Sequence, residues 1–153
     1  MSLDDTPVIT LRLLRQLKAA GKRLKAADST GVKLGGTDLL IRTLALRRYL
    51  LREVLGPDEK HVGVFLPPTV PAVAANFALA LADRVSVNLN YTVSSSVLQK
   101  CSEVAGLKHV ITSRKFMDKV GLDVGTEVIY LEDVREKITI GDKLFSALHV
   151  KLR

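Results

Sequence analysis

The sequence predicts an α/β fold: a mostly parallel sheet of βαβ units with helices on both faces, preceded by an amphipathic helix and a β-hairpin. Two observations carry this prediction. Short apolar runs of strand length alternate with helical segments from residue 61 to residue 131, which is typical of parallel sheets with right-handed crossovers. Residues 61–92 alone contain a strand, a Pro-Pro-Thr turn, an apolar helix, a second strand and an Asn-Tyr-Thr turn.

Composition indicates one globular domain with an aliphatic core. The chain has 153 residues, of which 47% are hydrophobic and 25% charged, with no Trp and 5% aromatic residues. These values are typical of a folded rather than a disordered chain. The net charge is +7, and residues 1–60 hold +5 of it, with 12 Lys/Arg against 7 Asp/Glu. Such an excess suits an anionic membrane surface or an acidic protein, or solubility alone. A nucleic-acid partner is not expected, because the few aromatics do not interleave with a basic patch.

The single cysteine and the amino terminus favour a cytoplasmic protein. Cys101 has no partner for a disulfide, which fits a reducing compartment. We expect Cys101 to be a buried helix residue, with a nucleophile as the alternative. Met-Ser-Leu followed by two acids does not resemble a signal peptide. The most apolar run, residues 70–82, is far shorter than the roughly 20 residues of a membrane span. We therefore expect a cytoplasmic protein, and the alternative location is the cytoplasmic face of the membrane.

Residues 1–25 are expected to form a basic amphipathic helix or linker, and residues 26–153 an α/β domain. The helix is predicted over residues 11–25. Its apolar stripe and its basic stripe both recur at helical spacing, and they hold Leu13, Leu17, Ala20 and Leu24, and Arg15, Lys18, Lys22 and Lys25. The apolar stripe is expected to pack on the domain; the alternative is an anionic membrane surface.

A hairpin and a long helix follow. Asp-Ser-Thr-Gly turn chemistry predicts the hairpin over residues 26–34. Residues 31–36 lack the Gly-Lys-Ser/Thr ending of a phosphate loop. Thr37 is the predicted N-cap of a helix over residues 38–55. Arg47 lies on its core face and is expected to snorkel or pair with an acid, with a functional basic site as the alternative. The apolar members of that face are Leu40, Leu44, Leu51 and Val54.

The predicted strands of the sheet are residues 62–66, 85–89, 109–112 and 127–131. The predicted helices between them are residues 70–82, 95–104 and 114–120, capped by Thr69, Ser94 or Ser95, and Ser113. A turn or helical piece over residues 133–137 and a final helix over residues 140–152 complete the chain. The buried face of the helix over residues 95–104 is expected to hold Val97, Leu98, Cys101 and Val104 or Ala105.

No catalytic constellation is found in the sequence. The three histidines have no partner at i+3 or i+4, which argues against a metal site; they are His61, His109 and His149. GxSxG, HExxH and Walker A motifs are missing. The first strand ends in Pro-Pro-Thr, where a dinucleotide fold carries glycines. Three acids are expected to form a surface cluster rather than a catalytic pair: Glu132, Asp133 and Glu136.

Ligands approach a doubly wound sheet at the carboxyl ends of its strands. Here those ends are predicted at residues 67–69, 90–92 and 112–114, where hydroxyls, an amide and the guanidinium of Arg114 gather. Arg114 next to a helix N-terminus could hold an anion. The alternative is ordinary capping chemistry. No catalytic, cofactor-binding or metal-binding residue is therefore assigned.

Six segments, in order and at matching spacing, resemble the opening of adenylate-forming (AMP-binding) enzymes. They are Ala-Asp-Ser-Thr-Gly at 27–31, Thr-Asp-Leu-Leu at 37–40, Leu-Ala-Leu-Arg-Arg at 44–48, Val-Gly-Val-Phe-Leu-Pro-Pro-Thr at 62–69, Val-Ser-Val-Asn-Leu-Asn-Tyr-Thr at 85–92 and His-Val-Ile-Thr-Ser at 109–113. Within that family, the segments most resemble acyl-CoA or acyl-acyl-carrier-protein synthetases, in particular the synthetase domains fused to lysophospholipid acyltransferases. Asp38 stands where an aromatic residue is usual, and Asp83 and Asn88 stand where Gly and Pro are common.

The resemblance implies ATP-dependent activation of a carboxylic acid such as a fatty acid, through an acyl-adenylate to a thioester. ATP and Mg²⁺ are then cofactors of the parent enzyme, and CoA or an acyl carrier protein is the acceptor. The family's Ser/Thr/Gly-rich loop ending in Lys, its ribose-holding acid and its lid lysine have no match here. The resemblance therefore implies that residues 26–153 are the incomplete N-terminal α/β subdomain of such a synthetase. We expect this fragment to bind neither cofactor and to be inactive alone.

The fragment's main expected partner is the missing C-terminal part of the same synthetase. A truncated domain exposes apolar surface, so a homodimer through such a patch is a further expectation. The alternative function is a non-catalytic interaction module that binds an acidic carrier protein or an anionic membrane surface. The acyl substrate, the acceptor and the oligomeric state do not follow from the sequence.

Overall fold

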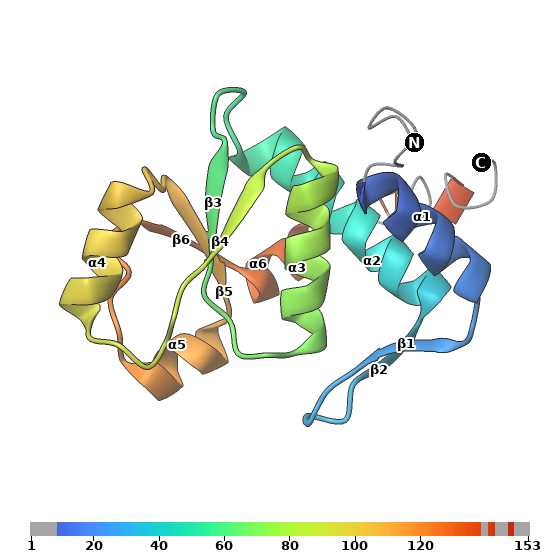
Figure 1. Ribbon diagram of the computed structural model, residues 1–153, viewed down its shortest axis with the longest axis horizontal. Coiled ribbons are helices and arrows are strands. Elements are labelled where there is room, and N and C mark those ends of the chain that lie inside the picture. The colour runs from blue at the N-terminus through green and yellow to red at the C-terminus, as the bar shows by residue number, and fades with distance from the viewer. Residues whose placement is uncertain (1–8, 139–140, 143–146, 149–153) are drawn as a thin grey trace, which may run out of the picture.

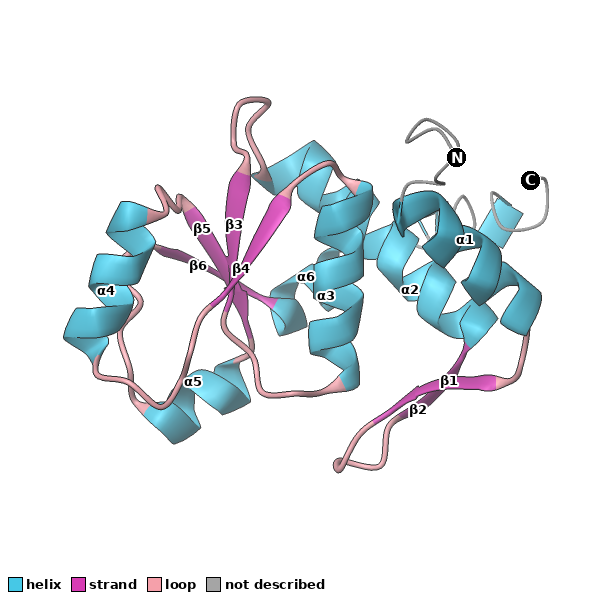
Figure 2. Cartoon of the chain, in the orientation of Figure 1, coloured by secondary structure: helices cyan, strands magenta, loops and turns pink. Residues whose placement is uncertain are grey.

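The computed structural model describes residues 9–138, 141–142 and 147–148. Figures 1 and 2 show the elements in space. In chain order they are α1 (Ile9–Ala20), β1 (Leu24–Ala27), β2 (Lys33–Gly35), α2 (Gly36–Tyr49), the π-helical turn η2 (Leu50–Val54), β3 (His61–Val64), α3 (Val70–Leu81), β4 (Val85–Asn88), α4 (Ser95–Val104), β5 (His109–Thr112), α5 (Arg114–Val120), β6 (Glu127–Tyr130) and α6 (Leu131–Lys137).

Strands β3 to β6 form a parallel sheet in the order β4-β3-β5-β6. Strand β3 lies inside the sheet, with β4 on one side of it and β5, followed by β6, on the other. The direction of winding therefore reverses between β3 and β5, which is the topological switch point of a doubly wound sheet. The predicted fold class, a parallel α/β sheet preceded by a helix and a hairpin, is confirmed.

Helices cover both faces of the sheet (Figure 1). Helices α2, α3 and α6 pack on one face, and α4 and α5 on the other. Successive side chains of a strand point to opposite faces, so Val62 and Val64 enter the first core and Phe65 the second. Gly63 lies against Val110, and a Cβ there would stand 2.6 Å from Val110 Cγ2. Residue 63 must be glycine because the side chain of Val110 in β5 approaches it so closely.

The helix predicted over residues 11–25 is shorter than expected. It ends at Ala20, because Gly21 takes a left-handed conformation (φ 55°) and the chain then enters β1. The inward part of the predicted apolar stripe is confirmed. Leu17 is buried in a cluster of side chains from α1, β2, α2 and α3, and Leu13 packs against that cluster. Leu24, expected to belong to that stripe, lies instead in β1 and is 59% exposed.

Helix α2 begins at Gly36, with Gly35 as its N-cap, so the prediction of Thr37 as the N-cap is wrong. A Cβ on Gly36 would collide with Leu17 O and would lie 2.6 Å from Ala20 Cβ. The glycine pair thus lets α1 cross the start of α2 closely. Of the predicted core face only Leu40 is buried; the partly buried remainder is Leu44, Leu51 and Val54. The deepest side chains of α2 and η2 are Leu39, Thr43 and Leu50.

The prediction that Cys101 is buried is wrong, because Cys101 is exposed on α4. Leu98 and Ser102 form the buried face, while Val97 and Val104 are 46% and 76% exposed. Both stripes recur at helical spacing, and the sequence pattern favours the more apolar one. The sheet determines which stripe turns inward, and α4 rests on it through Leu98.

The last strands and α5 agree closely with prediction. The bounds of β5 and α5 match to the residue, and Ser113 Oγ accepts the predicted capping bond from Phe116 N at 3.3 Å. The predicted final helix over residues 140–152 lies mostly outside the described residues. Within the described part, the buried Asp142 accepts bonds from Arg48 Nε (2.9 Å) and Arg52 Nη1 (2.7 Å), which fastens this segment to α2 and η2. No helix of the described residues is long and apolar enough to cross a membrane.

Candidate functional site

The switch point between β3 and β5 is bridged by a buried hydrogen bond. Thr112, at the carboxyl end of β5, donates through Oγ1 to Phe65 O at 2.6 Å. Both residues are fully buried. Since all four strands run parallel, the three predicted loops at residues 67–69, 90–92 and 112–114 do lie at one edge of the sheet. The side of the sheet formed by the carboxyl ends of the four strands is called here the carboxyl edge, and it is the first candidate site.

The hydroxyl and amide groups of this edge are engaged within their own turns. Thr69 Oγ1 donates to Pro67 O at 3.1 Å. Asn90 Oδ1 accepts from both Thr92 N and Thr92 Oγ1 at 2.9 Å, which is an Asx turn. These groups are thus engaged in turn bonds rather than in a convergent binding site. Thr69 and Ser94 occupy the predicted N-cap positions of α3 and α4, but neither side chain makes a capping hydrogen bond.

Arg114 is also held by its own neighbours. Its guanidinium makes a two-pronged ion pair with Asp133 (2.6 and 2.8 Å) and lies 4.4 Å from the centre of the Tyr130 ring. The backbone N–H of Arg114 donates to the Glu132 carboxylate at 3.1 Å. The bond from Arg114 lowers the pKa of Asp133, and the same bond raises the pKa of Arg114. Because carboxylates of the chain already occupy the start of α5, the predicted anion site at Arg114 is not free. Glu136, the third acid of the predicted cluster, is exposed.

A carboxylate that the sequence analysis did not single out joins the hairpin to the sheet domain. Asp28 Oδ2 accepts from Val70 N, the first residue of α3, at 2.8 Å. Its other oxygen accepts from Thr30 Oγ1 (2.6 Å), Thr30 N (2.9 Å) and Val32 N (3.3 Å). The Thr30 hydroxyl, then Val70 N, lower the pKa of Asp28. The turn signal Asp-Ser-Thr-Gly was visible in the sequence, but its contact with a helix start 42 residues away was not.

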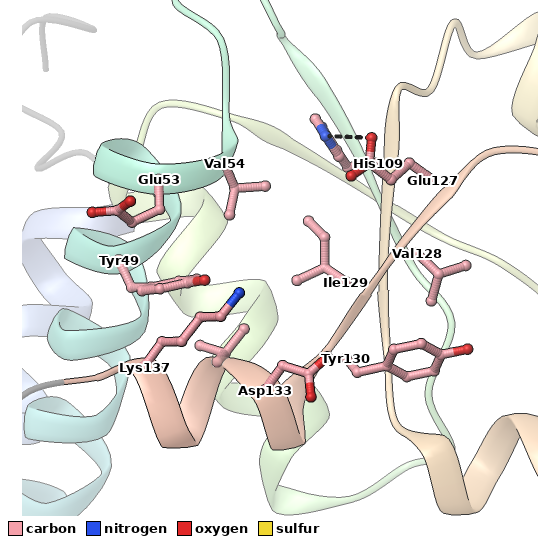
Figure 3. Close-up of a pocket in the computed structure, with 11 residues that line it drawn as sticks. Tyr49, Glu53, Val54, His109, Glu127, Val128, Ile129, Tyr130, Asp133 and Lys137 are labelled. Atoms are coloured by element: carbon pink, nitrogen blue, oxygen red, sulfur yellow. Dashed lines mark ion pairs between the residues drawn. The ribbon is translucent and has the colours of Figure 1, made fainter.

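A cavity lies along the free edge of β6 and is called here the edge cavity (Figure 3). Its volume is about 320 Å³, and it is lined by all four residues of β6, three of α2 and η2, three of α6, and His109. Neighbouring strand residues point to opposite faces, so a cavity that touches four in a row faces the strand's edge. Order β4-β3-β5-β6 leaves that edge unpaired among the described residues.

The histidines do not form a site at the carboxyl edge. His109 begins β5, at the amino ends of the strands, and its Nδ1 lies 2.9 Å from both oxygens of the buried Glu59. Its Nε2 lies 3.5 Å from Glu127 Oε2 (Figure 3). His61 is exposed, and His149 lies outside the described residues. No group of three metal-ligating side chains that could hold a metal ion occurs in the described part of the chain.

A larger groove, called here the hairpin groove, opens between β2, α2, α3 and α6. Its volume is about 730 Å³ and its lining is mostly apolar, including Leu34, Ile41, Val70 and Leu131. Three charged residues also line it: Asp38, Arg42 and Arg135. Val70 and Leu131 follow the carboxyl ends of β3 and β6, so the groove reaches the same side of the sheet as the switch point.

Arg47 has a structural role. Its Nε donates to Leu81 O at 2.7 Å, at the last residue of α3. A cation at the carboxyl end of a helix satisfies a free carbonyl and interacts well with the helix dipole. The partner is therefore a backbone carbonyl, and not an acid, which was one of the two roles expected from the sequence.

The described residues do not fit ATP and Mg²⁺. The loop after β3 carries prolines instead of a glycine-rich phosphate cradle, and Arg114 and its two acids are engaged with one another.

Comparison with known proteins gives a clear structural likeness. No protein-family model matches the chain. A crystal structure of the nonribosomal peptide synthetase FmoA3 with bound α-methyl-L-serine-AMP matches over 91% of the chain, at 18% identity and a TM-score of 0.75. VinN matches over 94% at 19% identity and a TM-score of 0.72. The N-terminal subdomain of Klebsiella oxytoca NpsA matches over 86% at 14% identity and a TM-score of 0.70.

The chain spans only part of these proteins: 16% of FmoA3, 37% of VinN and 33% of the NpsA subdomain. NpsA has also been solved as an artificial adenylation–PCP di-domain, of which the chain covers 24%. Identities below one fifth establish the fold and not the activity. The chain therefore shares the fold of part of FmoA3, of VinN and of the N-terminal subdomain of NpsA.

Proposed function

We propose that this chain is the front part of an ATP-dependent acyl-activating enzyme and serves there as scaffold, inactive alone. The carrying observation is the structural likeness to the nonribosomal peptide synthetase FmoA3 and to the N-terminal subdomain of NpsA, over 91% and 86% of the chain. The six resembling sequence segments support the same conclusion independently. The carboxylic acid is proposed to be a fatty acid, activated as acyl-AMP and transferred to CoA or an acyl carrier protein in the cytoplasm.

Two features of the structure support a scaffold role. The polar groups at the carboxyl edge bond within the chain, for example Arg114 with Asp133, so they stiffen the edge and leave the reacting groups to other residues. The edge of β6 beside the edge cavity pairs with no strand in the described part of the chain, and it offers a place for further polypeptide to pack. ATP and Mg²⁺ would then be held by the part of the enzyme that completes this sheet.

The test has two parts. The reading frame that encodes this chain should continue into a glycine-rich loop ending in Lys within a few dozen residues of Arg153; a frame that stops without it contradicts the proposal. ATP–pyrophosphate exchange should be detectable for the full encoded product with an aliphatic acid and undetectable for the 153-residue chain. Exchange by the chain alone would refute its role as scaffold only.

A stand-alone interaction module remains the second candidate, favoured by the basic α1 described below. It predicts a complete gene product of this length that folds cooperatively and shows no nucleotide chemistry.

A further inference from the structure

The segment from Ile9 to Lys25 presents positive charge without acidic counter-charge. It holds six exposed basic residues and no Asp or Glu; the basic residues are Arg12, Arg15, Lys18, Lys22, Arg23 and Lys25. Arg23 bonds to the carbonyls of Ala19 and Ala20 at the end of α1. The other five make no ion pair with any described residue. This set of six residues is called here the N-terminal basic surface.

Large apolar side chains stand exposed within the same segment. Ile9 is 79% exposed, Leu11 49% and Leu24 59%. They are not needed for packing, because the inward face of α1 is already buried through Leu17 and Ala20. Helix α1 also lies at the end of the molecule away from the four-stranded sheet, with α2 between them (Figure 1). A flat object could therefore reach this segment without meeting the sheet domain.

We propose that the N-terminal basic surface binds the surface of an anionic lipid bilayer, with Leu11 and Leu24 entering the headgroup region. Clustered Lys and Arg are attracted by anionic lipids, and apolar side chains beside them gain by leaving water at the interface. A nucleic acid would use the charge but not the leucines, and it usually requires aromatic stacking. The proposal is independent of the acyl-activating function.

The expected effect follows from the charges. Each Lys or Arg near an anionic surface strengthens partitioning roughly five-fold. The variant Lys18→Glu/Lys22→Glu/Lys25→Glu should therefore bind anionic vesicles at least about 100-fold more weakly. Leu11→Ser/Leu24→Ser keeps every charge and should weaken binding by a smaller but measurable factor. Because these side chains are exposed, both variants should fold, which circular dichroism checks.

The matched control is Lys108→Glu/Lys115→Glu/Lys119→Glu. These three lysines are exposed too, and the net charge changes by the same amount, but they lie before β5 and in α5. The control should keep most of the binding, because charges away from the contact are screened over about one Debye length.

Vesicle co-sedimentation is the measurement, with phosphatidylcholine alone and with phosphatidylcholine mixed with phosphatidylglycerol. Binding to the anionic vesicles only, weaker with added salt, lost in the lysine variant and kept in the control, supports the proposal. Absence of binding, equal loss in the control, or no effect of the leucine variant overturns it. Retention on polyglutamate without vesicle binding would assign the surface to an acidic protein and also overturns the proposal.

Discussion

Replacing Thr112 by valine tests whether the switch point is held by one side-chain hydrogen bond. Thr112 Oγ1 donates to Phe65 O at 2.6 Å, and Thr112 and Phe65 are both fully buried. No backbone N–H of the described residues donates to that carbonyl. Valine has nearly the shape of threonine, so the substitution removes the bond and changes little else.

The expected loss of stability is about 1–3 kcal/mol, because a buried carbonyl left without a donor bears its full desolvation cost. For a chain of this size 1 kcal/mol corresponds to about 2–4 °C in Tm, so Tm should fall by roughly 2–12 °C. Thr112→Ser keeps the hydroxyl and loses a methyl group, and Thr112→Ala loses both. The difference between the alanine and serine variants should again be about 1–3 kcal/mol, because it isolates the hydroxyl.

Urea denaturation followed by far-ultraviolet circular dichroism measures all four proteins. The midpoints should fall while the slope stays constant, since a changed slope would report a changed denatured or native state. A Thr112→Val protein as stable as the parent would refute the reasoning. So would alanine and serine variants of equal stability, because the bond would then contribute nothing measurable.

Three further predictions concern single residues. Gly63→Ala places a Cβ 2.6 Å from Val110 Cγ2 and should lower the free energy of unfolding by about 1–3 kcal/mol, measured by urea denaturation; an unchanged midpoint would show that β5 can yield. Thr43→Val removes a buried hydroxyl that has no hydrogen-bond partner among the described residues and should raise stability by roughly 1 kcal/mol, seen as a higher Tm, whereas a lower Tm would reveal a hidden bond. The lowered pKa of Asp28 makes its contribution present above its unfolded value of about 3.9 and lost as pH falls through the folded pKa. Asp28→Asn should therefore be less stable than the parent at neutral pH and nearly equal to it in acid; a gap that persists in acid would contradict the ionic role.

Elements whose signals are local could be predicted from the sequence to the residue. Helix α5 starts where Ser113 Oγ accepts a hydrogen bond from Phe116 N. It ends before Gly121, which adopts a left-handed conformation (φ 60°). Both signals act within a few residues. Helix α1 is different, because its periodic pattern continues through Leu24 although the chain has already entered β1. Gly21, in its left-handed conformation (φ 55°), ends the helix, and β1 then pairs with β2; the periodic pattern reflects neither event.

The candidate site fails to follow from the sequence for the same reason. Arg114 next to a helix start has the chemistry of an anion site, but its partner Asp133 lies 19 residues later and arrives only when β6 lines up beside β5. Asp28 is recognisable as a turn residue, and only the packed fold brings it to the start of α3. Residue type indicates what a side chain can bind, while topology determines whether a partner of the same chain has already bound it.

The three loops of the carboxyl edge are fixed by bonds within the chain. Three interactions each fix one loop of that edge. They are the hydrogen bond from Thr112 to the Phe65 carbonyl, the Asx turn at Asn90 and the ion pair of Arg114 with Asp133. Loops fixed in this way hold their geometry without a ligand, and preorganised geometry lowers the cost of binding or catalysis by groups placed against them. Among the described residues the outer edge of β6 is unpaired, and the edge cavity lies along it. Under the proposed function, the bonds that engage these residues within the chain would make them the rigid wall of a site completed by other residues.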